Sequence, residues 1–271
     1  MQKIKKSLGG LSTINIELTN RCNKNCWFCG RRERENRDPS IIDTYGDMDL
    51  KIVKKISQQI PNGVVVQFHN NGESLLYPSF GKAVSYFDGK IKNVVTNGKL
   101  LLYKYDEIVE NLDTISISVI ENDPEADEQY KIIKEFIDKK KDKLPQVIIR
   151  CNGDVQDIER YKKLGVTIAY RQLHSPLGSF NYVKRQPTIP EVGICWDFLH
   201  HLAINKDGDV SICVRFDPER AGVLGNINDS SLLQLWNSDK RTEWLKLHMC
   251  GKRNQVPLCS KCEFFGVPTG A

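Results

Sequence analysis

The sequence contains no long hydrophobic run. No stretch of its 271 residues approaches the roughly 18 consecutive apolar residues that a membrane-spanning helix needs. The basic N-terminus is not followed by the apolar core of a signal peptide, and we find no internal repeats or low-complexity segments. We therefore expect a cytoplasmic protein with no membrane partner.

A strong excess of one charge is also missing. The 39 Lys and Arg residues against 34 Asp and Glu residues leave a net charge of +5, spread along the chain. This balance fits a few anionic ligands but argues against a nucleic-acid partner. The length is sufficient for one large α/β domain, or for a barrel-like domain with a small appendage.

Cysteine, in contrast, is plentiful. The chain has nine cysteines, an odd number, and most of them lie in two groups, at residues 22–29 and 195–262. Because no export signal is seen, a disulfide framework is not expected. Metal binding is the better interpretation of both groups.

Six short runs rich in β-branched residues alternate with helix-like stretches. The runs are 14–18, 63–69, 92–97, 113–119, 146–151 and 165–171, and candidate helices lie near 79–88, 101–110, 125–140 and 156–163. Apolar strands that alternate with helices are typical of parallel βαβ units. The predicted fold class is α/β, as a partial (β/α)6 barrel or an open doubly wound sheet.

The pattern changes near residue 185. A proline-containing linker at 184–193 precedes a predicted hairpin over 202–214 with Asp207-Gly208 at its turn, then a helix over 231–249 and a cysteine-bearing tail. We predict two domains, 1–185 and 186–271.

The first group is formed by Cys22, Cys26 and Cys29, which follow the first predicted strand and can point three thiolates at one centre. Structural zinc sites and four-iron clusters usually take four ligands, and the closest histidine is His69, in the next strand. Three thiolates would leave one metal position open, as catalytic metal sites do.

This C-x3-C-x2-C motif, with Phe28 just before the third cysteine, resembles that of the radical S-adenosylmethionine (SAM) enzymes. The resemblance implies a [4Fe–4S] cluster on Cys22, Cys26 and Cys29, whose open iron is chelated by SAM. It also implies a flavodoxin- or ferredoxin-type electron donor, cleavage of SAM to a 5′-deoxyadenosyl radical, and hydrogen abstraction from a substrate.

Further segments match the family in the expected order. Asn71-Gly72-Glu73 resembles the family's Gly-Gly-Glu segment, which holds the SAM amino group, with Asn71 in place of the first glycine. The other implied SAM contacts are Asn97, Ser116, Ser118 and Arg150. All lie near the carboxyl ends of consecutive predicted strands, where βα folds place their active sites. The residues alone leave two alternatives open, a helix-start carboxylate for Glu73 and a surface arginine for Arg150.

The second group adds up to four thiolates, which form a closed site. Cys195, Cys213, Cys259 and Cys262 could by themselves bind zinc or an iron–sulfur cluster. Their spacing resembles the SPASM appendage of radical SAM enzymes, or its shortened twitch form, and implies a small hairpin-and-helix domain. Because the chain ends soon after Cys262, we expect one auxiliary [4Fe–4S] cluster. The roles of Cys151 and Cys250 stay open; a buried strand residue and an unligated thiol are expected.

A fully ligated auxiliary cluster is suited to electron transfer. We therefore expect an oxidoreductase that dehydrogenates a small hydroxylated metabolite. Arg171 matches an arginine that relatives place beside the substrate, and His174 is a candidate acid or base. The alternative is a maturase that modifies a ribosomal peptide, although the segment before the first strand is too short for a leader-binding domain. A zinc-stapled binding module without catalysis is a third interpretation.

Overall fold

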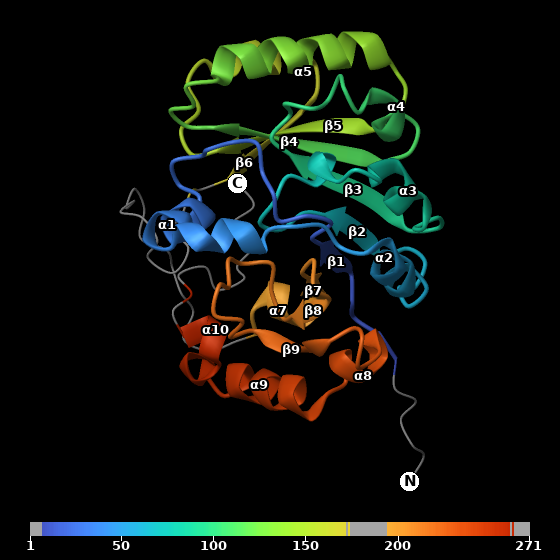
Figure 1. Cartoon of the computed structure of the whole chain (residues 1–271), viewed down its shortest axis with the longest axis vertical. Coiled ribbons are helices and arrows are strands. Elements are labelled where there is room, and N and C mark those ends of the chain that lie inside the picture. The colour runs from blue at the N-terminus through green and yellow to red at the C-terminus, as the bar shows by residue number, and fades with distance from the viewer. Residues whose placement is uncertain (1–6, 172, 174–193, 261, 263–271) are drawn as a thin grey trace.

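The computed structural model describes residues 7–171, 173, 194–260 and 262. In this part of the chain a single sheet has the strand order β6-β5-β4-β3-β2-β1-β7-β8-β9 (Figure 1). The strands are β1 (Thr13–Ile16), β2 (Val65–Phe68), β3 (Ile91–Thr96), β4 (Thr114–Ile120), β5 (Gln146–Asn152), β6 (Thr167–Arg171), β7 (His201–Ile204), β8 (Asp209–Ser211) and β9 (Val223–Asn226).

The described helices are short, apart from α5 and α9, which lie near opposite ends of the molecule (Figure 1). They are α1 (Gly30–Arg37), α2 (Leu50–Ser57), α3 (Phe80–Ser85), α4 (Tyr105–Ile108), α5 (Ala126–Lys140), α6 (Ile158–Lys162), α7 (Trp196–His200), α8 (Leu232–Trp236), α9 (Asp239–Met249) and α10 (Pro257–Ser260), with 3-10 turns η1 (Pro39–Thr44), η2 (Ser74–Leu76) and η4 (Arg253–Gln255). None of the described helices is long and apolar enough to cross a membrane.

The first six strands confirm the predicted fold class. Strands β1 to β6 pair parallel in the order of the sequence, and β6 lies at an edge of the sheet. The described strands therefore form a partial barrel that is not closed. Their carboxyl ends lie along one edge of the sheet, so the loops after β1 to β6 come together there.

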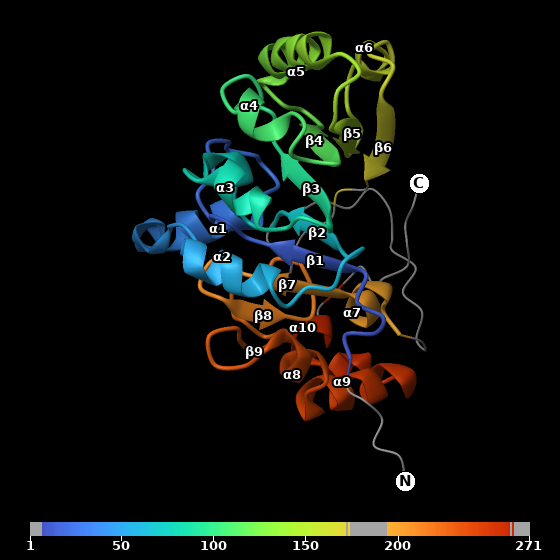
Figure 2. The ribbon, with the colours of Figure 1, turned by 90° about the vertical axis from the view of Figure 1, so that its right-hand side faces the viewer.

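One face of this sheet is apolar and is covered by the connecting helices (Figure 2). Alternate strand residues such as Ile14, Val66 and Ile117 are fully buried on it. Helix α5 buries Gln129, Ile133, Phe136 and Lys140, whose spacing of three and four residues marks one side of the helix. The opposite, inner face is polar, as Asn15, Gln67 and Asn93 show.

The hairpin predicted near 202–214 is present, but it is not a detached unit. Strand β7 pairs parallel with β1, with Thr13 opposite His201, so the C-terminal strands extend the barrel sheet. Strands β7 and β8 are antiparallel, and Gly208 adopts a positive φ of 88° in their turn, which suits glycine. The third strand, β9, was not predicted. The predicted domain boundary at residue 185 lies outside the described residues and stays a prediction.

Two helix predictions were wrong in extent. The helix expected over 101–110 is reduced to α4, and the long helix expected over 231–249 is divided into α8 and α9. The division falls at Asn237 and Ser238, because the Ser238 side chain accepts a hydrogen bond from the amide of Arg241 and starts a new helix.

A small second core belongs to the C-terminal unit, which we define as residues 194–262. It consists of Cys195, Phe198, Ile212, Trp244, Val256 and Leu258, and Cys213 and Cys259 pack against it. Figure 1 shows this unit, with α9, at the opposite end of the molecule from α5. Both cysteine groups are thus built into folded parts of the chain.

Candidate active site

Cys22, Cys26 and Cys29 lie in the loop between β1 and α1, at the carboxyl edge of the sheet. All three thiols are partly exposed. Burial, together with the nearby thiols of Cys29 and Cys22, raises the pKa of Cys26 to about 12, and burial also raises the pKa of Cys22. Buried thiols of this kind need a cationic centre to become thiolates, and the three-cysteine donor set fits a [4Fe–4S] cluster.

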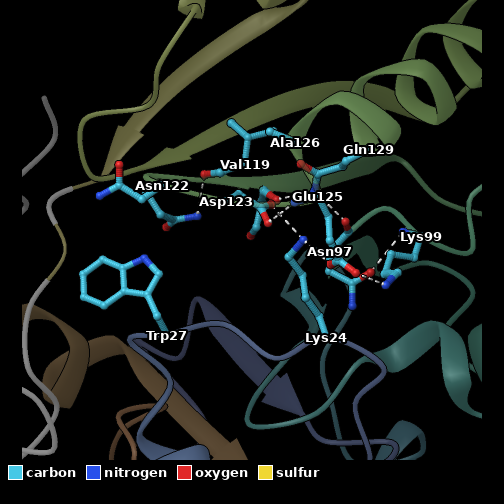
Figure 3. Close-up of polar contacts among 12 residues, drawn as sticks. Lys24, Trp27, Asn97, Lys99, Val119, Asn122, Asp123, Glu125, Ala126 and Gln129 are labelled. Carbon is cyan, nitrogen blue, oxygen red and sulfur yellow. Dashed lines mark hydrogen bonds and ion pairs between the residues drawn. The ribbon is translucent and has the colours of Figure 1, made fainter.

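The cysteine loop is fastened to the ends of two other strands by charged side chains (Figure 3). The Lys24 ammonium lies 2.8 Å from the Asp123 carboxylate and 2.9 Å from Glu125, which also binds Lys99 at 2.6 Å. The side chains of Lys24 and Asp123 are 3% and 4% exposed, so this is a buried ion pair. Burial alone would lower the pKa of Lys24, but the two carboxylates outweigh it and hold the pKa above its usual value.

Neutral contacts complete this attachment. The Trp27 indole N–H donates to the carbonyl of Glu121 at 2.9 Å, just after β4. The Asn97 side chain donates to the Asn23 side chain at 2.8 Å and approaches the sulfur of Cys22 at 3.9 Å. Asn97 was predicted as a SAM contact, and here it also lies beside a predicted cluster ligand.

Asn71, Gly72 and Glu73 form the turn after β2, directly against the cysteine loop. A Cβ atom on Gly72 would lie 2.0 Å from the carbonyl oxygen of Thr19, so only glycine allows this approach. The amide of Asn71 donates to Glu17 at 3.1 Å, and the carbonyl of Arg21 accepts from the amide of Glu73 at 2.8 Å. The β2 turn and the cysteine loop therefore have one fixed relative position.

Glu73 is a buried carboxylate with protein donors around it. It accepts from the Thr96 hydroxyl at 2.8 Å and from the amides of Asn97 and Leu75 at 2.7 and 3.1 Å. Burial raises the pKa of Glu73, and these three donors lower it. Its Oε2 atom has one such donor and can accept a second one, as an ammonium group would require. Both the SAM role and a role in joining the ends of β2 and β3 fit this geometry.

The remaining SAM candidates share the inner face of the sheet. Ser118 lies opposite Arg150 in the β4–β5 register, and Ser116 lies two residues earlier on the same face. Arg150 is held among the strands rather than on the outer surface, and its Nε atom has no hydrogen-bond partner. Arg171 is on the same face at the end of β6. The structure thus brings these four residues to one face, while their contacts with SAM and substrate stay predictions.

Other predicted residues separate from this group or fall outside the structure. Phe28 is half-buried and meets Trp27 edge to face, with ring centres 5.7 Å apart. Cys151 is buried on the helix-covered face, where burial raises the pKa of its thiol to about 11, and Cys250 is exposed at the end of α9. His174 lies outside the described residues.

The four cysteines of the second group also come together. The thiols of Cys195, Cys213, Cys259 and Cys262 are close enough to influence one another's ionisation. Burial, with the neighbouring thiols, raises the pKa of Cys259 to about 12. In the described part of the chain, no three His, Cys, Asp or Glu side chains converge closely enough to hold one metal ion. Gathered thiols at wider spacing fit a four-iron cluster, whose ligands are farther apart than those of a single ion.

Several neighbours of these sites were not found from the sequence. His248 stacks on Phe198 with ring centres 4.8 Å apart and lies next to the amide of Cys195, while Lys24 and Asp123 form the ion pair described above. Burial and Arg253 lower the pKa of His248 to about 4, so the ring is neutral. Lys24 stands between two cysteines of the motif, but nothing in the sequence indicates its partner about a hundred residues away.

A polar cavity of about 360 Å3 opens between the cysteine loop and the C-terminal unit. Glu17, Asn71 and Arg31 line it from the barrel, and Cys213 and Arg215 line it from the C-terminal unit. The cavity therefore lies at the carboxyl edge of the sheet, with Cys213 of the second cysteine group in its wall.

Comparisons with known proteins agree with this arrangement. Residues 195–263 match the SPASM family, described as an iron–sulfur cluster-binding domain. The chain is 21% identical over 272 residues to the S-adenosyl-L-methionine-dependent 2-deoxy-scyllo-inosamine dehydrogenase of Niallia circulans, covering 95% of each chain.

Two solved structures share the fold. The structure of anSMEcpe with bound AdoMet has a TM-score of 0.66 at 16% identity, covering 91% of this chain and 88% of that one. Streptococcus suis SuiB bound to the precursor peptide SuiA has a TM-score of 0.57 at 15% identity, covering 94% of this chain and 71% of SuiB.

These findings confirm the resemblance stated from the motifs. They also support the predicted cofactor set, SAM and two [4Fe–4S] clusters, which the two cysteine groups fit. With three thiols at the carboxyl edge of a partial barrel and four on the C-terminal unit that matches SPASM, the chain is similar in sequence and fold to SAM-dependent enzymes that carry auxiliary iron–sulfur clusters.

Proposed function

We propose that this protein is a radical SAM oxidoreductase that dehydrogenates a small hydroxylated metabolite. The observation that carries the proposal is the similarity to a SAM-dependent dehydrogenase along 95% of both chains. A second supporting observation is the C-terminal unit, whose four thiols would occupy every protein-ligand position of an auxiliary cluster and leave none for substrate. Such a site is suited to accept an electron rather than to bind a reactant.

The cofactors would supply the radical chemistry. Bound SAM and the first cluster would supply a radical that takes a hydrogen atom from a carbon bearing a hydroxyl group, and the oxidised auxiliary cluster would accept the one electron that, with a proton, must leave to give a ketone.

The residues of the chain would position these partners. Cys22, Cys26 and Cys29 hold the first cluster, and the Lys24 ion pair keeps their loop against the ends of β3 and β4. We assign Asn71, Glu73 and Ser118 to SAM and Arg171 to the substrate. Arg171 would bind and polarise a substrate oxygen, because an arginine side chain stays protonated.

The test uses anaerobically reconstituted protein, dithionite and SAM. Candidate metabolites carry deuterium on the carbon that bears the hydroxyl group, and mass spectrometry follows the label. We expect deuterium in 5′-deoxyadenosine together with one ketone per label transferred, and neither with the Cys26→Ser variant.

The same experiment separates the alternative function. The fold is shared with SuiB, whose structure holds a precursor peptide. If no metabolite transfers its label and a deuterated peptide does, the protein is a maturase and the metabolite proposal is wrong. Zinc without sulfide in the purified protein would reject both.

A further inference from the structure

The inner face of the barrel carries an ordered polar ladder at its lower level. The side chains of Asn15, Gln67, Asn93 and Thr114 are joined by consecutive hydrogen bonds of 2.7, 3.0 and 2.7 Å. These residues lie opposite one another in the strand register. The ladder fixes which alternate residues of each strand point inward.

Toward the carboxyl edge, the inner face above the ladder carries one imidazole and two guanidinium groups, while the carboxylate of Glu17 accepts from the amides of Asn71 and Lys206. His69 comes two residues after Gln67, and Arg150 comes four residues after Gln146, the partner of Thr114, so both face inward. Arg171 lies two residues after Ala169, the partner of Arg150, and is its diagonal neighbour on the same face. The two guanidinium groups share this face with the imidazole and lie close enough to lower its pKa.

No acidic side chain in the described part of the chain balances these arginines. Neither Arg150 nor Arg171 makes a side-chain hydrogen bond or an ion pair there, although the Nε atom of Arg150 is buried. Burial, together with the charges of Arg171 and Arg215, lowers the pKa of Arg150 to about 10. Burial and the same two inner-face arginines lower the pKa of His69 to about 3, so its ring is neutral. A buried guanidinium without a counter-charge is costly unless a ligand supplies one.

We propose that the substrate carries an anionic oxygen group, a carboxylate or a phosphate ester, which Arg171 binds together with Arg150. This inference rests on the proposed function and narrows its substrate class. Guanidinium groups bind such oxygens in pairs of parallel hydrogen bonds, which would also orient the rest of the substrate. An amine, such as the inosamine in the name of the relative, would meet like charge here.

The carboxylate of SAM does not account for both arginines. The resemblance places SAM at the cysteine loop, which follows β1, and at the turn after β2. Arg171 ends β6, at the far edge of the six parallel strands from β1. If Arg150 binds the SAM carboxylate, Arg171 is still available for a second anion.

The test is a binding measurement that does not depend on turnover. Reconstituted protein saturated with SAM is titrated calorimetrically with inorganic phosphate or acetate, at constant ionic strength set with chloride. We expect one of the two anions to bind, and its identity distinguishes a phosphate ester from a carboxylate. Arg171→Gln should weaken that binding at least tenfold, and Arg171→Lys should weaken it less.

Lys163→Gln is the matched control, because it removes one exposed positive charge from the end of α6. It should bind the anion as the unchanged protein does. Iron content and circular dichroism verify that each variant is folded and loaded, and Arg171 is exposed at a sheet edge, where substitution is tolerated.

Three results would overturn the inference. The first is that neither anion binds better than chloride. The second is that Arg171→Gln binds the anion as the unchanged protein does, and the third is that Arg171→Gln weakens only the binding of SAM. Failure of the proposed function is a different result, since it would appear as no 5′-deoxyadenosine with dithionite even when the anion binds.

Discussion

The loop of Cys22, Cys26 and Cys29 is held by charged and polar side chains, whereas the four cysteines of the C-terminal unit are gathered around an apolar core. The first environment depends on Lys24, Asp123 and hydrogen bonds to strand ends. The second depends on Phe198, Trp244 and their neighbours. A site that must admit SAM and substrate needs polar walls, while a site that only moves an electron can be closed and apolar.

The largest effect should separate the two sites by function. Cys26→Ser should abolish SAM cleavage, because it removes a ligand of the cluster that binds SAM. Cys259→Ser should leave 5′-deoxyadenosine formation measurable but stop ketone formation. Chromatography of both products, with iron and sulfide analysis, checks this. Equal loss of 5′-deoxyadenosine in both variants would contradict separate roles for the first site in SAM cleavage and for the second site in accepting an electron.

The buried ion pair should dominate the stability of the first site. Lys24→Met leaves Asp123 buried without its partner and should lower the free energy of unfolding by about 3 to 5 kcal/mol. The double variant Lys24→Met with Asp123→Leu should recover much of this loss. Lys134→Met breaks an exposed pair with Asp138 and should leave the free energy of unfolding almost unchanged. Denaturant unfolding measures all three, and a Lys24 effect as small as the control would contradict the buried-pair interpretation.

The charged inner face should make stability depend on pH. His69 has a pKa of about 3 in the fold against 6.5 ordinarily, so the unfolded chain binds the extra proton. The neutral His69 ring therefore contributes fully to the free energy of unfolding above pH 6.5, and this contribution is lost as the pH falls toward 3. Near pH 5.5 the free energy of unfolding is lower by about 1.4 kcal/mol. His69→Gln should therefore flatten the curve of unfolding free energy against pH between about 7.5 and 5.5. An unchanged slope would mean that His69 is charged in the folded protein.

The smallest effect concerns the C-terminal unit. Ser238→Ala removes the side-chain cap of α9 and should cost about 1 kcal/mol. Ser238→Asp keeps an N-cap acceptor and should be nearly neutral. Thermal unfolding followed by circular dichroism measures both. A loss in the aspartate variant equal to that in the alanine variant would argue against the cap.

The local features of the first site were readable from the sequence. The six alternating runs predicted the parallel strands, and the cysteine spacing predicted both groups and their family. The spacing also placed Asn71, Gly72 and Glu73 after β2, where the structure has them against the cysteine loop. These signals are short-range, because they depend on residues that follow one another along one strand or loop.

The sequence by itself determined which residues could ligate metal and where strands would alternate with helices, since both follow from residue type and local periodicity. Only the tertiary structure decided that β7 would pair with β1, that Lys24 would pair with Asp123, and that Arg150, Arg171 and His69 would lie near one another on the inner face. Each of these depends on pairing between segments far apart in the chain. Burial, which sets the charge and the partners of such groups, exists only after those segments have packed together.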